Sequence, residues 1–213
     1  MPGILDPASY DAWYYSGKGK WIGETEFSLI RKLIHPASDK TLLDVGCGTG
    51  YFSQRFNDIG LDVTGIDIDE NMLDYARLQH KAMKFIQGDA HHLPFDNDSF
   101  DYATAITSLC FIHDPQHALS EMWRVSRKGV VLGLLNRNSL LYLLKHKSKS
   151  YKGARWDTST SAYSWLTELH PQPRVKIYSA VWYPFDNHLS HWIESIIPNN
   201  LRYGGFLGIS LMK

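Results

Sequence analysis

The chain has 213 residues, with 22 basic and 22 acidic side chains, so its formal net charge at pH 7 is zero. A neutral chain lacks the overall attraction to polyanions that basic nucleic-acid-binding domains show, which leaves only a local basic patch to consider. Hydrophobic residues make up 44% of the chain, which is enough for the buried core of a single domain and too much for a disordered protein.

The first two thirds of the chain alternate between strand and helix patterns. Short apolar runs predict strands over residues 41–45, 63–66, 85–86, 101–106 and 130–135, and apolar residues at helical spacing predict helices over residues 25–35, 51–59, 69–80 and 114–129. Asp69 and Asp114 are suited to cap their helices, and Pro115 fits a first helical position. This alternation predicts an α/β fold with a doubly wound, mostly parallel sheet and right-handed crossovers.

The pattern loosens after Leu135. A short helix is predicted over residues 140–144, and the last forty residues favour a strand over 174–183, a helix over 188–197 and a strand over 205–212. The segment between is basic and then aromatic, without a clear period, and we find no internal repeat.

A glycine-rich segment follows the first predicted strand. It reads Asp44-Val45-Gly46-Cys47-Gly48-Thr49-Gly50 and leads directly into a predicted helix. Glycines permit a sharp turn and a close approach to a ligand, and the free amides of a helix start favour negative groups. A purely structural turn is the alternative, and the spacing departs from the dinucleotide fingerprint Gly-x-Gly-x-x-Gly because the third glycine comes one residue early.

Two further acids end neighbouring strands. Asp67 ends the second strand, where a carboxylate can accept hydrogen bonds from ribose hydroxyls, and Asp89 follows the third, where a carboxylate can accept from an adenine amino group. A solvated or helix-capping acid is the alternative for Asp67. Because the carboxyl ends of parallel strands share one edge, Asp44, Asp67 and Asp89 are expected to converge on one nucleotide-like ligand.

These motifs resemble the series found in class I S-adenosylmethionine-dependent methyltransferases, in the small-molecule branch known as type 11. The resemblance covers roughly residues 40–136 and rests on four segments, namely 44–50, Gly65-Ile66-Asp67, Gly88-Asp89-Ala90 with Leu93-Pro94-Phe95, and Ser99-Phe100-Asp101. It implies a seven-stranded sheet with a terminal antiparallel hairpin, S-adenosyl-L-methionine as cofactor, and methyl transfer to the oxygen, nitrogen or carbon of an unidentified small molecule. Within one methyltransferase domain over 1–213, it implies N-terminal cap helices (1–36), a cofactor-binding core (40–135), a substrate-side insertion (136–173) and closing strands (174–213).

The resemblance also implies roles for individual residues. The methionyl part of the cofactor would lie against Asp44, Gly46, Cys47, Gly48 and Gly50, with Thr107 beneath it.

Residues later in the chain would bind the ribose and the adenine of the cofactor. Asp67 would hold the ribose, Asp89 and the Ala90 amide the adenine, and Ile68 and Leu93 would sandwich the ring. The N-terminal segment resembles parts that fold over the cofactor in relatives, with Tyr10 and Trp21 as lid contacts, although core packing explains these aromatics equally well.

Methyl transfer needs two groups held in line and shielded from water, and it requires no protein nucleophile. If the acceptor carries a proton, His113 is the candidate base and Tyr14 a weaker one, because histidine titrates near neutral pH and residue 113 follows the fourth strand. A loop histidine without a chemical role is the alternative. No metal site is predicted, because the histidine pairs lack a completing Asp, Glu or Cys.

The insertion carries a basic run at Lys145, Lys147, Lys149, Lys152 and Arg155. It could receive an acidic substrate or a membrane surface, or form a solvated loop. Nearby aromatics wall an acceptor site or pack under the loop; these are Tyr151, Trp156, Tyr163 and Trp165.

Two cysteines, Cys47 and Cys110, are too few for a disulfide scaffold or a four-cysteine zinc site. With no signal peptide or membrane-spanning run in the sequence, we expect a cytoplasmic protein whose partner is a small molecule, not nucleic acid. Three alternatives stay open: a catalytically silent cofactor-binding module, a nicotinamide-dependent oxidoreductase, and a methyltransferase acting on protein or RNA.

Overall fold

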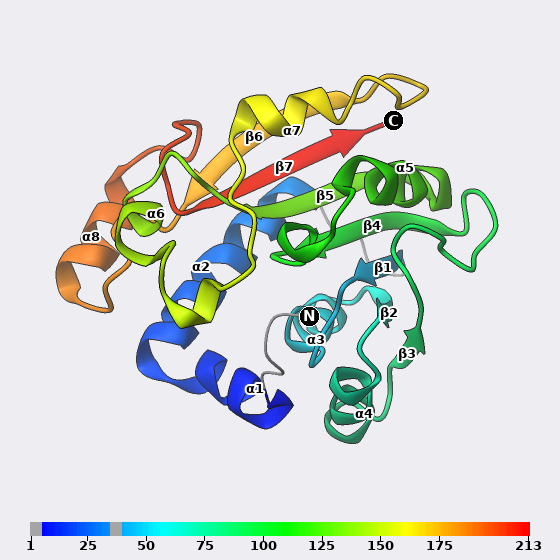
Figure 1. Cartoon of the computed structure of the whole chain (residues 1–213), viewed down its shortest axis with the longest axis horizontal. Coiled ribbons are helices and arrows are strands. Elements are labelled where there is room, and N and C mark those ends of the chain that lie inside the picture. Colours follow the sequence, from blue (N-terminus) through cyan, green and yellow to red (C-terminus); the bar gives the residue numbers. More distant parts are fainter. Residues whose placement is uncertain (1–5, 35–39) are drawn as a thin grey trace.

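The computed structural model describes residues 6–34 and 40–213, and it contains a seven-stranded sheet flanked by helices (Figure 1). The strands are β1 (Thr41–Val45), β2 (Asp62–Asp67), β3 (Lys84–Gln87), β4 (Phe100–Ile106), β5 (Ser126–Leu135), β6 (Arg174–Ala180) and β7 (Phe206–Met212). The helices are α1 (Pro7–Tyr15), α2 (Gly17–Ile34), α3 (Tyr51–Asp58), α4 (Glu70–Gln79), α5 (Pro115–Val125), α6 (Leu140–Lys145), α7 (Ser159–Ser164) and α8 (His188–Ile196), with short 3-10 turns η1 (Leu109–Phe111) and η2 (Lys149–Tyr151).

The strands lie in the order β3-β2-β1-β4-β5-β7-β6. The first five pair in parallel, and β7 pairs antiparallel with both β5 and β6. The predicted doubly wound sheet with a terminal antiparallel hairpin is therefore confirmed. The strand order reverses between β1 and β4, and ligands of open α/β sheets bind at such a switch point, beyond the carboxyl ends of the strands.

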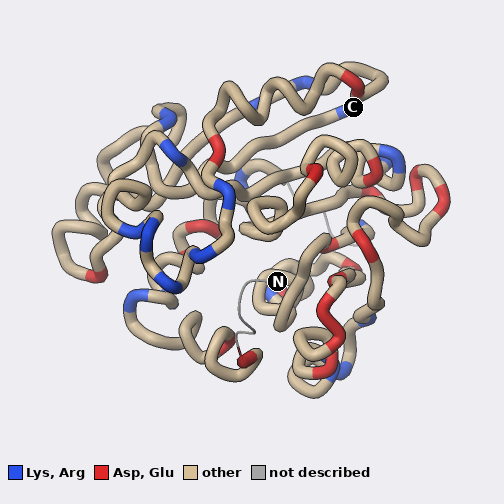
Figure 2. The backbone as a smooth tube through the Cα atoms, viewed as in Figure 1, with Lys and Arg blue, Asp and Glu red and all other residues tan. Residues whose placement is uncertain are grey.

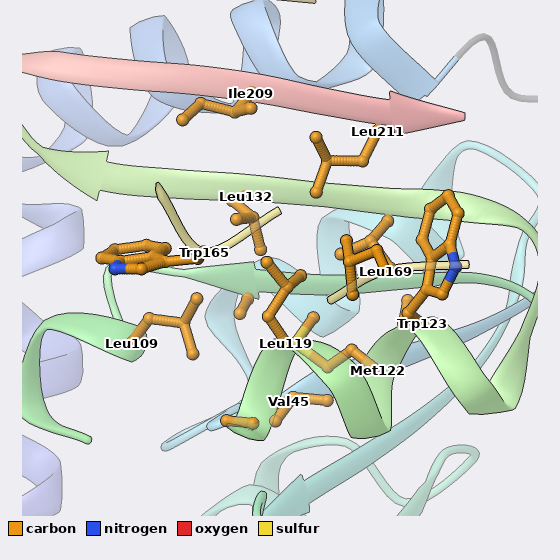
Figure 3. Packing of buried hydrophobic residues seen from close by; sticks show 14 of the residues in the cluster. Val45, Leu109, Leu119, Met122, Trp123, Leu132, Trp165, Leu169, Ile209 and Leu211 are labelled. Atoms are coloured by element: carbon orange, nitrogen blue, oxygen red, sulfur yellow. The ribbon is translucent and has the colours of Figure 1, made fainter. Parts of the chain in front are cut away.

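Each face of the sheet has its own apolar core. On one face, α5 and the segment around α7 pack against β4, β5 and β7, and Figure 3 shows Leu119, Met122 and Trp123 of α5 facing Leu132 and Leu211. On the other face, α2 and α3 pack through Ile30 and Phe56, among others. Burial on both faces explains the continuous apolar run of β5.

The first long helix begins earlier than its apolar pattern indicates. The sequence predicts a helix after Thr25, whereas α2 already begins at Gly17; the predicted end near Pro36 lies outside the described residues. Glycine disfavours a helix interior by roughly 1 kcal/mol relative to alanine, so its presence there needs a packing reason. A Cβ at Gly19 would overlap the Trp13 carbonyl, and one at Gly23 would lie 2.5 Å from the Tyr51 hydroxyl. These glycines let α1 and α3 approach α2 closely.

Two other boundaries differ from the predictions. The helix predicted to continue to Gly129 ends at Val125, because residues from Ser126 onward join β5 and pair with β4, and from Gly129 with β7 as well. Helix α7 has no counterpart among the predicted elements; it is held by a reciprocal cap between Thr158 and Ser161.

No helix within residues 6–34 and 40–213 has the length and apolarity to cross a membrane.

Candidate active site

The glycine-rich segment turns sharply at the end of β1. The amides of Gly46 and Cys47 both donate to the Ile66 carbonyl, at 2.7 and 3.2 Å, which ties the turn to β2. Gly46, Gly48 and Gly50 all have positive φ angles, of 71°, 54° and 84°, a region that costs other residues about 1–2 kcal/mol each. The backbone path of this turn therefore requires glycine.

Gly48 differs from its neighbours in what surrounds it. A Cβ on Gly46 would meet Ser108, and one on Gly50 would lie 2.8 Å from the His80 ring. A Cβ on Gly48 would have no atom within 4 Å. The Gly48 side of the turn is thus open, while the other two glycines face protein.

Asp67 braces this open turn. Its Oδ2 accepts from the Gly48 amide at 2.7 Å and its Oδ1 from the Asp69 amide at 2.9 Å, and the side chain is partly exposed at the end of β2. Burial raises the pKa of Asp67, and these amide hydrogen bonds oppose the rise. Each carboxylate oxygen has a second lone pair, so Asp67 can accept a further hydrogen bond from a ligand at the turn.

Asp44 lies below the turn and is 2% exposed. Its oxygens accept hydrogen bonds from Ser53 Oγ at 2.6 Å and Thr104 Oγ1 at 3.1 Å, which join β1 to α3 and β4. Burial raises the pKa of Asp44 to about 6. Asp44 consequently fixes the framework beneath the glycine turn. Cys47, 9% exposed, packs in a separate small cluster with Leu73, Ala76 and Phe85.

The residues predicted for an adenine ring divide into exposed and buried. Ile68 is 64% exposed just beyond Asp67, whereas Leu93 is 4% exposed and belongs to the core. Asp89 is exposed, and its Oδ1 accepts from the His91 amide at 2.9 Å, next to the partly exposed Ala90. Ile68 is therefore free to contact a ligand. The Asp89 Oδ1 also pairs with the His91 Nδ1 at 2.7 Å, which leaves its Oδ2 for a ligand, while Ala90 packs partly against the core and Leu93 offers little surface.

The end of β4 is strained. Thr107 has a φ angle of 51° and donates its amide to the Gly133 carbonyl at 2.8 Å. Non-glycine residues in this region cost of order 1–3 kcal/mol and cluster at functional sites. The next residue, Ser108, bonds the Val45 carbonyl at 2.7 Å, so the ends of β1 and β4 are locked together at the switch point.

Helix α1 is fastened over the glycine turn. Asp11, 7% exposed, accepts from Thr49 Oγ1 at 3.2 Å and from the Tyr75 hydroxyl at 3.1 Å. Tyr10, the neighbour of Asp11, is partly buried and its hydroxyl lies 3.2 Å from that of Tyr14. Tyr10 thus lies on the helix that covers the turn, and its role as a lid contact stays a prediction.

Trp21 lies at 9% exposure in the core on the α2 side, with its ring 5.4 Å from that of His191. Core packing accounts for this position of Trp21.

Two buried acids of the N-terminal helices are not among the residues predicted from the sequence. Asp11 lies in a segment in which only the aromatics indicate a role. Glu26 is 6% exposed on the apolar face of α2, between Ile22 and Ile30. Glu26 could have been found from the sequence, because it interrupts an otherwise apolar helical stripe and acids are almost never fully buried without a partner.

The candidate bases lie in contrasting surroundings. His113 is exposed, in the loop that precedes the α5 cap, and Tyr14 is 4% exposed with its ring stacked 3.8 Å from that of Tyr51. Burial raises the pKa of Tyr14 well above its ordinary value. The part of the chain that the structure describes contains no group of three or more His, Cys, Asp or Glu side chains that could hold a metal ion.

The charges of this neutral chain are unevenly distributed. Figure 2 shows the basic residues of the insertion gathered near the start of α2, and acidic residues along the β3 and α4 side. Within the basic run, Arg155 is committed to the fold: it donates to the carbonyls of Leu109 and Ile112 and to Asp157, each at 2.9 Å. The four lysines of the run are exposed.

The four aromatic residues of the insertion also differ in how far they are buried. Trp165 lies in the core at 8% exposure and Tyr163 is 42% exposed. Tyr151 and Trp156 are partly buried with ring centroids 5.1 Å apart, so of the four predicted aromatics these two remain available to line a site.

A protein-family model described as "Methyltransferase domain" matches residues 43–134. Among curated proteins, the chain is 36% identical over 187 residues to the demethylmenaquinone methyltransferase of Paenarthrobacter aurescens, covering 84% of this chain and 71% of that protein. It is 40% identical over 91 residues to the malonyl-[acyl-carrier protein] O-methyltransferase of Yersinia pestis, covering 43% of this chain and 34% of the relative. The chain spans between 34% and 43% of the length of the first three curated relatives.

Solved structures share the fold. The crystal structure of a SAM-dependent methyltransferase from Thermotoga maritima superposes with a TM-score of 0.75 at 23% identity and covers 97% of this chain and 95% of that one. A second, from Mesorhizobium loti, gives a TM-score of 0.68 at 18% identity over 88% of this chain and 97% of that one. At such identities the likeness establishes the fold alone.

Proposed function

Since this chain belongs to the class I S-adenosylmethionine-dependent methyltransferases, we propose that it transfers the methyl group of S-adenosylmethionine to a small-molecule acceptor. The observation that carries the proposal is the open glycine turn at the switch point of the sheet, where the Gly48 amide and the Asp67 carboxylate meet at 2.7 Å. When bound, the cofactor supplies an activated methyl group on a sulfonium sulfur.

The residues around the turn fit this cofactor. The space beside Gly48, where a Cβ would meet no atom, admits a ligand close to the backbone, as a methionyl group requires. Asp67 retains lone pairs for ribose hydroxyls, and Ile68 exposes an apolar surface suited to one face of an adenine ring. Asp89 and the Ala90 amide would serve the edge of that ring.

Other residues would act by exclusion and support. Asp44 holds the floor of the turn without facing solvent, and Thr107 holds the strained end of β4. Tyr10, on the helix fastened through Asp11 to Thr49, would cover the methyl group and exclude water, which favours an in-line displacement. Trp21 and Leu93 would support these residues from the core, because both side chains are almost completely buried.

A small acceptor agrees with the zero net charge, which gives no general attraction to RNA. The named activities of the relatives, toward demethylmenaquinone and malonyl-[acyl-carrier protein], also concern small acceptor groups. Cys47 and Cys110 are free and buried, which is consistent with a reducing compartment and supports the cytoplasm as the place of action.

Calorimetric titration tests the cofactor assignment. We expect the chain to bind S-adenosylmethionine and not NAD, and Asp67→Ala to abolish binding. Asp62→Ala is the matched control, because Asp62 is exposed at the opposite end of the same strand. Equal affinity of the two variants would contradict the assignment.

A further inference from the structure

Glu26 is a buried acid without a hydrogen-bond or ion-pair partner among residues 6–34 and 40–213. It is 6% exposed, and no described residue forms a hydrogen bond or ion pair with it. The carboxylate oxygens of Glu26 are not among the completely buried polar atoms that lack a partner. The small accessible part of this side chain therefore includes its carboxylate. An unpaired buried carboxylate is costly, and this one points to a ligand that completes it.

Tyrosine rings pack against the part of α2 that carries Glu26. A Cβ on Gly23, one turn before Glu26 on the same helix face, would lie 2.5 Å from the Tyr51 hydroxyl and 3.0 Å from the Tyr14 ring, and the hydroxyls of Tyr14 and Tyr10 lie 3.2 Å apart. Burial chiefly, and the charge of Glu26 in addition, raise the pKa of Tyr10, Tyr14, Tyr51 and Tyr151. No Lys, Arg or His among the described residues lowers the pKa of Glu26, which burial raises to about 8. The surroundings of this carboxylate are therefore aromatic and without a counter-charge.

The same phenols connect Glu26 to the cofactor side of the site. The Tyr10 hydroxyl lies 3.2 Å from that of Tyr14, and the next residue, Asp11, accepts from Thr49 Oγ1 in the glycine turn at 3.2 Å. Burial, and then the charges of Glu26, Cys110 and Asp67, raise the pKa of Tyr10. Cys110 bonds the carbonyl of Thr107 at 3.1 Å, at the end of β4. Glu26 thus belongs to the N-terminal layer of side chains from α1 and α2 that packs over the glycine turn.

We propose that Glu26 binds the ammonium group of a small amine acceptor and takes its proton. A lone carboxylate among phenol rings complements a cation, because the carboxylate supplies the counter-charge and ring faces attract ammonium groups. In the step assigned to Glu26, an N–H bond of the ammonium breaks and an O–H bond forms on the carboxylate. The nitrogen keeps its electron pair, which then attacks the methyl group. This inference rests on the proposed methyltransferase function and names the acceptor class for it.

Three probes of one shape test the acceptor class: benzylamine, benzyl alcohol and benzoate, titrated by calorimetry into the full chain saturated with S-adenosylhomocysteine. The wild type is expected to bind benzylamine at least about tenfold more tightly than benzyl alcohol, as for a charge-assisted hydrogen bond. Glu26→Gln removes that preference. The matched control, Glu24→Gln, changes an exposed acid on the same helix that pairs with Arg55 and keeps the preference.

Proton release gives a second readout. Burial raises the pKa of Glu26 to about 8, whereas an ammonium ligand favours the carboxylate. Amine binding at pH 7 is therefore expected to release up to one proton, measured by titration in buffers of different ionisation enthalpy. Glu26→Asp retains the release and Glu26→Gln loses it.

An equal affinity for amine and alcohol in the wild type, or an amine preference kept by Glu26→Gln, overturns the inference. Tighter binding of benzoate or of the alcohol assigns a different acceptor class and overturns it as well. Absence of S-adenosylhomocysteine binding by the wild type would instead overturn the proposed function.

Discussion

The stability of the fold should depend on pH through Glu26. Burial raises the pKa of this carboxyl from 4.5 to about 8, so between these values the folded chain holds a proton that the unfolded chain has lost. The folded state binds more protons than the unfolded state in this range, and stability therefore falls as pH rises from about 4.5 to about 8. The side chain is 6% exposed, so solvent screens little of this effect.

The magnitude follows from the protonation equilibrium. Each pKa unit corresponds to about 1.4 kcal/mol, so the rise in the Glu26 pKa amounts to about 5 kcal/mol at most at pH above 8. Glu26→Gln has the same shape and no proton to lose. Without any ligand, the variant should match the wild type within about 1 kcal/mol near pH 4.5 and exceed its unfolding free energy by about 2–5 kcal/mol at pH 8.5.

Urea unfolding at pH 5 and at pH 8.5 measures this difference. Glu24→Gln serves as the control, because that acid is about half exposed and its loss should change stability by less than about 1 kcal/mol at either pH. A difference between Glu26→Gln and wild type that is the same at both pH values would refute the assignment of Glu26 as a buried, unpartnered acid.

Three other expectations concern the lid, the thiols and the loop histidine. Asp11→Ala leaves two hydroxyls without their acceptor, so we expect a loss of about 1–3 kcal/mol and faster proteolytic cleavage of α1 than in the control Asp58→Ala; equal cleavage rates would argue against the fastening of this helix. Burial raises the pKa of the Cys47 and Cys110 thiols, so a disulfide reagent should label neither thiol in the native chain and both in urea. Rapid labelling of either thiol in the native chain would show that this thiol is accessible to solvent and would contradict its burial. In a methyl-transfer assay, His113→Ala should retain most of the rate, because the inference above assigns the proton transfer to Glu26. Loss of a general base costs roughly a hundredfold or more, so a rate loss of that size would identify His113 as the base.

The sequence predicts the strand part of the site well, for a physical reason. Parallel strands bring their carboxyl ends to one edge, so acids and glycines placed directly after apolar runs must meet there. This reasoning placed Asp67 and the glycine turn correctly on the described sheet. It could not separate Asp44 from Asp67, because whether a carboxylate faces solvent depends on partners such as Ser53 and Thr104 that lie elsewhere in the chain.

The helical layer was less predictable. The early start of α2 depends on glycines that meet α1 and α3, which are contacts that no local pattern encodes. The strand character of Ser126–Gly129 likewise arises from pairing with distant strands. The same holds for Glu26, because only the folded chain shows that this side chain is buried without a partner among the described residues.

Calorimetric titration of the full chain with S-adenosylmethionine tests the central claim most directly. The account predicts one site of micromolar affinity, lost in both Asp67→Ala and Gly48→Val while thermal unfolding shows that each variant is folded. It also predicts unchanged affinity in Asp62→Ala. No binding by the wild type, or micromolar affinity retained by Asp67→Ala or Gly48→Val, would contradict it.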